Sequence, residues 1–239
     1  MSTFFADVTF SVNATTTLGE QAAHHARVKR LQVGDEVSLT NGAGSIGHGS
    51  ISAIKKTSVE VSIATVLVVP PPLAIHLRAP VADRDRMLML AEKGTELGIA
   101  SWQSVRFRRS LSVSPRGDGP AFTEKLRARM IAALEQSGGA WLPKILDETS
   151  ISSIEFSSDQ IPIALDASGD PLTSVTKTIG ARAPVVLVGP EGGIEPEELA
   201  RLVDAGWRRV RLAPNTLRFE TAGIAAVAAI RSTHQGEEE

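Results

Sequence analysis

Residues 185–193 read Val185-Val186-Leu187-Val188-Gly189-Pro190-Glu191-Gly192-Gly193, an apolar run that ends in a turn with three glycines. Four consecutive apolar residues bounded by a turn are typical of a strand buried on both faces, as in a parallel sheet. Residues 196–205 follow with acidic residues at their start and Gly206 as a stop, which predicts a helix. A strand, a tight turn and a helix form the repeating unit of an α/β fold.

The flanking sequence continues this alternation. Further strands are expected at residues 73–77, 162–165 and 210–212, and further helices at residues 84–97, 122–136 and 220–231. This order predicts a mainly parallel sheet with helices on both faces.

The first seventy residues have a different pattern. Alternation and β-branched residues predict strands at 7–12, 36–40, 47–54 and 58–69, with a hairpin signal at Asn41-Gly42 and one helix at 19–31. Several short strands of this kind favour a small β-barrel. Pro70-Pro71-Pro72 cannot continue a sheet, so we place a linker there and expect domains at 1–72 and 73–239.

Composition excludes several classes of site. The chain has 239 residues, a net charge of −2 and no cysteine, so disulfides, thiolate metal sites and a cysteine nucleophile are impossible. No leader and no membrane span are expected, which favours a cytoplasmic protein without a membrane partner. The charge is uneven, because residues 78–129 carry eleven Lys or Arg against six acids. That sector is a candidate for phosphate contacts.

Two loops follow predicted strands at the edge where parallel sheets bind ligands. The glycine turn at 189–193 is neither a Walker loop nor Gly-x-Gly-x-x-Gly. A ligand site and a plain tight turn explain it equally well. The second loop runs from Leu212 to Ala222 and contains Arg218 and Glu220. Glu220 can be a helix cap or a catalytic group, whereas a cation at a helix start opposes the dipole and suggests that Arg218 has an external anionic or carbonyl partner.

These two loops carry a family resemblance. Gly189-Pro-Glu-Gly-Gly193, followed by Leu212-x-Pro-x-x-Leu-Arg-x-Glu-Thr-Ala222, resembles the RsmE family of the SPOUT superfamily. Three more segments match in order, and the resemblance spans the chain: residues 24–35, residues 92–98 and Glu135-Gln-Ser-Gly138 with Pro143. The chain departs from the usual family pattern at Gly139, Ala213, Asn215 and Phe219.

The resemblance implies an S-adenosylmethionine-dependent methyltransferase that acts on uracil N3 of 16S ribosomal RNA in the small ribosomal subunit. It implies an N-terminal PUA-like β-barrel, a C-terminal trefoil-knotted SPOUT domain and a homodimer. A small-residue face on the last helix, Ala222, Ala225, Ala226 and Ala229, fits a helix interface or burial in its own chain. The usual protein-only C5 methylation is excluded, because it needs a cysteine nucleophile. No metal is required for direct transfer to N3.

Direct transfer to N3 suggests the catalytic residues of the site, and the resemblance implies its cofactor contacts. Arg218 would hold the uracil carbonyl or a phosphate, and Glu191 and Glu220 would be proton acceptors, with turn and cap roles as the alternatives. The cofactor would contact Leu165, Val188, Gly189, Pro190, Glu191, Gly192, Gly193, Leu212, Ala213, Pro214, Thr216, Leu217 and Arg218.

RNA would meet the basic sector. The candidates are Arg106, Arg108 and Arg109 after a strand-like segment, Lys125 and Arg129 on one helix face, and Arg27 and Arg30 in the first domain. A solvated surface is the alternative for each single charge. Trp102, Phe107 and Trp141 can be base-stacking platforms or core, and His24-His25 fits helix packing better than metal binding. Two other functions stay open: a non-catalytic RNA-binding or ribosome-assembly module, and a knotted ribose 2′-O-methyltransferase.

Overall fold

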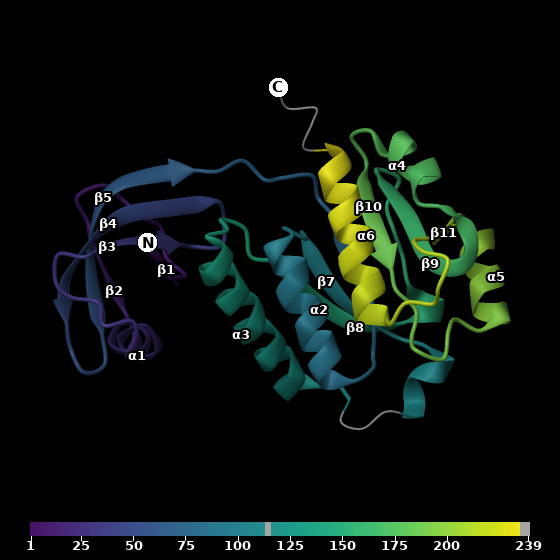
Figure 1. Cartoon of the computed structure of the whole chain (residues 1–239), viewed down its shortest axis with the longest axis horizontal. Coiled ribbons are helices and arrows are strands. Elements are labelled where there is room, and N and C mark those ends of the chain that lie inside the picture. Colours follow the sequence, from purple (N-terminus) through teal and green to yellow (C-terminus); the bar gives the residue numbers. More distant parts are fainter. Residues whose placement is uncertain (113–115, 235–239) are drawn as a thin grey trace. The chain divides into compact units, whose positions relative to one another are not determined.

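The computed structural model describes residues 1–112 and 116–234, and divides the chain into two compact units (Figure 1). The first unit consists of Met1–Pro71 and Ile131–Leu142, and the second of Pro72–Met130 and Pro143–Glu239. The chain therefore passes between the units within the proline triplet, and it returns to the first unit along the end of a helix.

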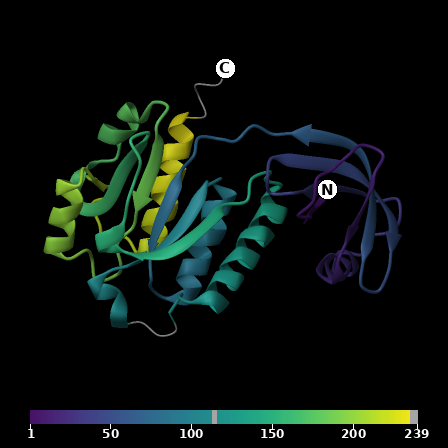
Figure 2. The same ribbon diagram turned by 180° about the vertical axis from the view of Figure 1, so that it is seen from behind.

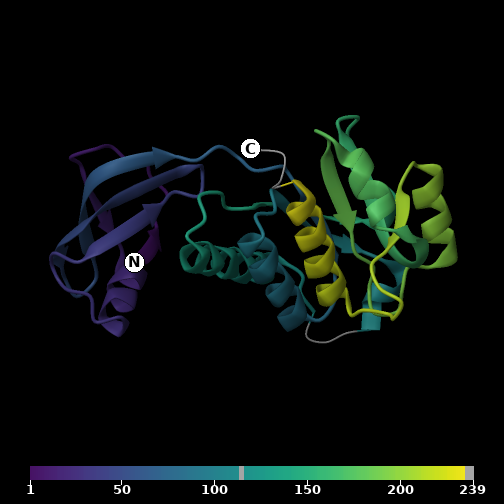
Figure 3. The ribbon, with the colours of Figure 1, turned by 45° about the horizontal axis from the view of Figure 1, so that its top comes forward.

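The first unit is a curled five-stranded sheet with one helix at one end, α1 (Glu20–Val28) (Figure 3). Its strand order is β1-β3-β4-β5-β2, and only β1 and β3 pair in parallel. The buried side chains include Phe4, Leu39, Ile51 and Ile63. The strands are β1 (Ser2–Phe5), β2 (Thr15–Leu18), β3 (Glu36–Thr40), β4 (Ser45–Ile54) and β5 (Val59–Val68).

Most of the sequence predictions for this unit are confirmed, since β3, β4, β5 and α1 lie where they were expected. The strand predicted at 7–12 is wrong. Of its apolar residues, Phe10 is buried, but Val8 and Val12 are half exposed. The next residue, Asn13, has a left-handed φ of 65°, which turns the chain into β2. The three alternating apolar residues therefore do not form one buried face.

The second unit is a six-stranded sheet in the order β11-β9-β10-β6-β7-β8, and every neighbouring pair is parallel. The predicted mainly parallel α/β architecture is thus confirmed. The strands are β6 (His76–Pro80), β7 (Ser101–Arg106), β8 (Lys144–Ser150), β9 (Gln160–Pro171), β10 (Ala183–Leu187) and β11 (Arg208–Arg211). The helices are α2 (Arg84–Glu96), α3 (Pro120–Ser137), α4 (Thr173–Ile179), α5 (Pro196–Asp204) and α6 (Phe219–His234), with 3-10 turns η1 (Arg108–Ser112) and η2 (Ile151–Ser153).

Several boundaries in this unit differ from the expected ones. The strand expected at 73–77 begins at His76, because pairing with β7 runs from His76 to Pro80 and pairing with β10 from His76 to Arg78. β8 and α4 were not predicted. β8 is an edge strand with the sequence Lys-Ile-Leu-Asp-Glu-Thr-Ser, so it lacks the apolar run of a central strand.

Helices pack on both faces of this sheet. α2 and α6 contact each other, and α6 also contacts β6 and β10. Figure 1 shows these two helices in front of the sheet, and Figure 2 shows the strands before them in the view from behind. Leu202 of α5 packs with Val185, Leu187 and Trp207 in a separate cluster. Ala226 is fully buried, which favours packing within the chain for at least part of the alanine face of α6.

The centre of the sheet contains one buried arginine. Arg78 is 5% exposed, and its Nη1 donates to the Ser101 hydroxyl at 3.3 Å. Its Nε has no partner in the part of the chain that the structure describes. His76 Nδ1 lies 2.8 Å from the same hydroxyl. No carboxylate in the described chain forms an ion pair with Arg78. Burial therefore lowers the pKa of Arg78 to about 10.

A folded-state pKa below the unfolded one means that the charged guanidinium destabilises the fold at neutral pH. We expect Arg78→Met to raise the free energy of unfolding by about 1–3 kcal/mol, the usual cost of a buried polar group without a partner. Denaturant unfolding at pH 7 measures this, with the exposed Arg201→Met as the matched control. A loss of stability in Arg78→Met alone would mean that the buried charge is compensated.

Candidate functional site

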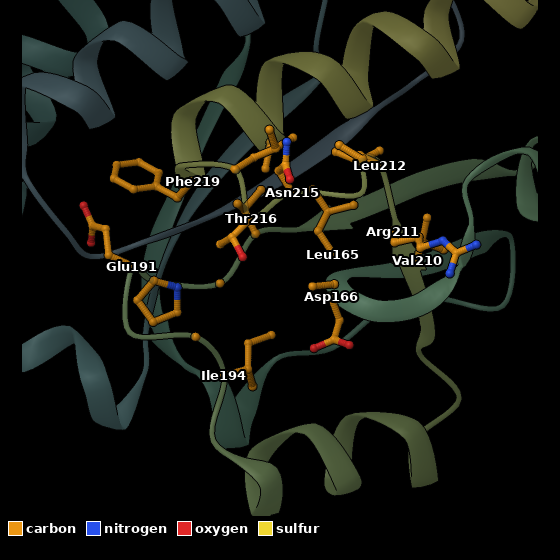
Figure 4. A pocket seen from close by; sticks show the side chains of 18 residues that line it. Leu165, Asp166, Glu191, Ile194, Val210, Arg211, Leu212, Asn215, Thr216 and Phe219 are labelled. Atoms are coloured by element: carbon orange, nitrogen blue, oxygen red, sulfur yellow. The ribbon is translucent and has the colours of Figure 1, made fainter.

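A pocket lies where β9, β10 and β11 meet the start of α6 (Figure 4). Its walls come from three segments far apart in the sequence: residues 165–167, residues 188–194 and residues 210–217, with Phe219 and Ala222 from α6. Two of these segments leave the carboxyl ends of parallel strands, which is where open α/β sheets bind ligands. The two loops singled out in the sequence therefore form one site.

The glycine turn is held tightly to the sheet. Val188 N donates to Arg78 O at 2.9 Å, and Gly193 N donates to Pro190 O at 2.8 Å to close the turn. Gly193 has a φ of +73°, and a Cβ on Gly189 would lie 2.8 Å from Ile194 Cγ1. Glycine at these two positions thus allows a backbone-lined wall of the pocket.

Ten of the thirteen residues expected at the cofactor line this pocket. They are Leu165, Val188, Gly189, Pro190, Glu191, Gly193, Leu212, Ala213, Thr216 and Leu217. Gly192, Pro214 and Arg218 are exposed and do not line it.

Eight lining residues were missed by sequence reasoning: Asp166, Ala167, Ile194, Val210, Arg211, Asn215, Phe219 and Ala222. Asp166 and Ala167 were missed because the strand was expected to end at Leu165, whereas β9 continues to Pro171. The signal that could have identified Asp166 is a polar residue directly after the apolar run of a strand.

The three expected catalytic residues occupy different environments. Glu191 is exposed at the pocket, and its Oε1 accepts from Arg86 Nη1 at 3.1 Å. Glu220, in the first turn of α6, is buried, and its Oε2 has no partner among residues 1–112 and 116–234. Arg218 is exposed just before α6, and its side chain has no interaction with the described residues. Only Glu191 lines the pocket itself.

The arginines after β7 are bound to carboxylates. Arg108 Nη1 lies 3.2 Å from Glu195 and 3.0 Å from Glu197, and Arg108 N donates to Glu198 Oε1 at 3.0 Å. The hydrogen bond from Arg108 to Glu195, and to a smaller extent that to Glu197, raises the pKa of this guanidinium. Arg109 Nη1 donates to Gly192 O, and its Nε lies 3.6 Å from Glu195. These arginines therefore fix the glycine turn and the start of α5.

The other expected RNA contacts are also placed. Arg106 pairs with Glu148 and, at 3.8 Å, with Asp118, and Arg129 pairs with Glu92 at 2.9 Å. Lys125 is exposed and has no partner within the described chain. In the first unit, Arg27 donates to Lys56 O at 2.7 Å, and Arg30 is exposed.

Burial and local contacts show the environment of the aromatic and histidine candidates. Trp102 and Phe107 are fully buried, so the core interpretation is confirmed for both. Trp141 Nε1 donates to Val69 O at 3.1 Å within the first unit. His25 packs on Phe4 with ring centroids 5.2 Å apart. Residues 1–112 and 116–234 contain no group of three or more side chains that could hold a metal ion, and no helix among them is long and apolar enough to cross a membrane.

Two family models match the chain. The model described as "RNA methyltransferase domain" matches residues 69–231, and the model described as "RNA methyltransferase PUA domain" matches residues 18–64. Relatives from Mycobacterium tuberculosis and Bacillus subtilis, both named "Ribosomal RNA small subunit methyltransferase E", are 26% and 25% identical. The alignments cover 95% and 93% of this chain, and 90% and 89% of the relatives.

Solved structures are similar over almost the full length. The ribosomal RNA small subunit methyltransferase E of Neisseria gonorrhoeae, bound to S-adenosyl methionine, has a TM-score of 0.88 and is 26% identical, with 97% of each chain covered. A predicted RNA methyltransferase of Thermotoga maritima has a TM-score of 0.75 and is 27% identical, with 98% of this chain and 99% of that chain covered.

The glycine turn gives a test of how the pocket wall is held. Gly193→Ala forces an L residue to a φ of +73°, so we expect a loss of about 1–2 kcal/mol and faster amide exchange in residues 189–194. Gly119→Ala is the matched control: it imposes a similar backbone strain, at a φ of +77° and with open space around its Cβ, and should leave exchange in residues 189–194 unchanged. Hydrogen exchange measures both. Unchanged exchange in the turn of Gly193→Ala would show that its conformation does not depend on this glycine.

Proposed function

Because the chain belongs to the RNA methyltransferase family, whose domain model spans more than half of its residues, we propose that it methylates uracil N3 of 16S ribosomal RNA with S-adenosylmethionine. The observation that carries the proposal is the pocket between the two loops, in a chain that matches an S-adenosyl methionine-bound relative over both units. An RNA of the small ribosomal subunit as substrate would place the protein in the cytoplasm.

The residues of the pocket fit such a cofactor. Leu165, Val188, Ile194, Leu212 and Leu217 offer apolar walls for a base, and the glycine turn offers backbone that a ligand can approach closely. S-adenosylmethionine supplies, when bound, an electrophilic methyl group on a positively charged sulfur. The chain's own contribution is to bind, to orient the acceptor and to exclude water.

The acceptor atom, N3, carries a proton that must be removed. We assign Glu191 as the first candidate to accept it, because its carboxylate is at the pocket and exposed. Glu220 is the second candidate; it lies outside the pocket lining, and its place in the first turn of α6 also suits a helix-start role. The guanidinium of Arg218 has no partner among the described residues, and we assign it to the uracil carbonyl or an RNA phosphate.

The RNA would be held by exposed cations. Lys125 needs no displacement to meet a phosphate, whereas Arg106, Arg108, Arg109 and Arg129 would have to exchange a carboxylate for it. Arg27 and Arg30 would contribute from the unit that matches the PUA model. The resemblance also supports a homodimer as the working unit, with the trefoil knot in the second unit.

Methyl mapping tests the proposed function. We expect S-adenosylmethionine to bind in calorimetry, and 16S ribosomal RNA from a deletion strain to lack one N3-methylated uracil that the purified protein restores, as read by mass spectrometry. A methyl group on a ribose hydroxyl would favour the 2′-O alternative. Folded protein that binds no cofactor would favour the non-catalytic RNA-binding alternative.

Arg218 gives a sharper test of the acceptor side. Arg218→Ala should lower the rate of methyl transfer by roughly 10²-fold or more, as loss of a charge-stabilising donor does, and leave cofactor affinity within about threefold. Single-turnover kinetics and calorimetry measure the two effects, with the exposed Arg208→Ala as control. A parallel loss of cofactor affinity would instead make Arg218 part of the cofactor site.

A further inference from the structure

Asp166 is a carboxylate of the pocket whose two oxygens differ. Oδ1 accepts three hydrogen bonds: from Ser168 N at 2.9 Å, from the Ser168 hydroxyl, and from Arg209 Nη2 at 2.9 Å. Oδ2 has no partner within the described chain. Asp166 lines the pocket, and Figure 4 shows its carboxylate among the side chains there. One oxygen is fixed, and the other is available to a ligand.

The backbone around Asp166 brings these donors together. The register of β9 and β11 shifts between Arg209 and Val210, so that Arg209 pairs with Ala164 and Val210 pairs with Asp170. A Cβ on Gly169 would lie 2.5 Å from the Arg209 carbonyl carbon and from Val210 N, so glycine permits this close approach. Because of this irregularity, residues 166–168 are not paired with β11, and the N–H and the hydroxyl of Ser168 both donate to Asp166 Oδ1.

The charge state of Asp166 suits an acceptor. The side chain is 21% exposed, and burial acts to raise the pKa of the carboxyl. Hydrogen bonds from Ser168 and Arg209 outweigh this effect, and the pKa of Asp166 is lowered overall. Asp166 is therefore ionised at neutral pH, and its charge is balanced by Arg209.

We propose that Asp166 Oδ2 accepts a hydrogen bond from a ribose hydroxyl of the bound cofactor. This inference rests on the proposed function, which supplies the cofactor. A carboxylate whose charge is already balanced by an arginine favours a neutral hydroxyl over an ammonium group. Acidic side chains near strand ends bind ribose hydroxyls in the same way in dinucleotide sites.

Calorimetry with S-adenosylhomocysteine tests the assignment without any methyl transfer. Asp166→Asn replaces the charged acceptor with a neutral group of the same shape, so we expect its affinity to fall about 10- to 100-fold, as for a hydrogen bond to a charged group. The matched control is Asp170→Asn on the same strand, which is exposed and outside the pocket lining, and which should bind as the wild type does. Equal affinity of Asp166→Asn and wild type would overturn the proposal.

A second measurement identifies the donor, and its wild-type arm does not depend on how the variant folds. Wild-type protein should lose about tenfold in affinity for either the 2′-deoxy or the 3′-deoxy analogue of S-adenosylhomocysteine, and Asp166→Asn should lose little further for that analogue, since the two changes remove one interaction. The ribose assignment would be overturned if the affinity losses from Asp166→Asn and from the deoxy analogue simply added. It would also be overturned if Asp166→Asn instead showed this coupling with an analogue that lacks the amino group. Wild-type protein that binds none of these ligands would count against the proposed function itself.

Discussion

The placement of β10 between β9 and β6 is the constraint on which the site depends. β10 pairs in parallel with both neighbours, and Val185, Val186 and Leu187 are completely buried. The bond from Val188 N to Arg78 O carries this pairing one residue past the strand, to the point where the glycine turn begins. The turn leaves the sheet at the edge where the loop after β11 also lies, and the two loops named from the sequence line one pocket. If the pairing slipped by one residue, each apolar side chain of β10 would change faces.

The strongest signals in the sequence were those set by local periodicity and by motif order. A run of four apolar residues identified β10, and the two loops supported the resemblance to the RsmE family, which the family models and the relatives confirm. The prediction of a strand at 7–12 was wrong because an alternating pattern does not show whether a neighbouring strand is available to pair with it. β8 was not predicted because an edge strand tolerates polar residues. The trefoil knot stays a prediction, because periodicity and pairing order do not encode how a chain is threaded.

The electrostatic environment was the part that sequence could not supply. Arg108 meets Glu195 and Glu197 across 87 and 89 residues of chain, and Arg86 meets Glu191 across 105. The net charge of residues 78–129 therefore overstates the positive charge available to RNA, since Glu148, Glu191, Glu195 and Glu197 pair with its arginines from outside this sector. A paired arginine can still bind a phosphate, but the exchange of one anion for another gains less than a new ion pair would. The interactions of Arg108 and Arg109 reduce the positive charge available to RNA, and they also hold the glycine turn and the start of α5 in place.

The acidic residues of the site divide their roles by environment. Asp166 is held ionised by Ser168 and Arg209, and a carboxylate with a lowered pKa is a poor proton acceptor, so it suits binding and not removal of the N3 proton. Glu220 is buried in the first turn of α6, a place that also suits the helix-start role kept as its alternative. Glu191 is exposed at the pocket, and Arg86 donates a hydrogen bond to one of its two carboxylate oxygens. The binding proposed at Asp166 and the proton transfer proposed at Glu191 can therefore be tested separately, because the two carboxylates lie on different segments of the pocket wall and have different arginine partners.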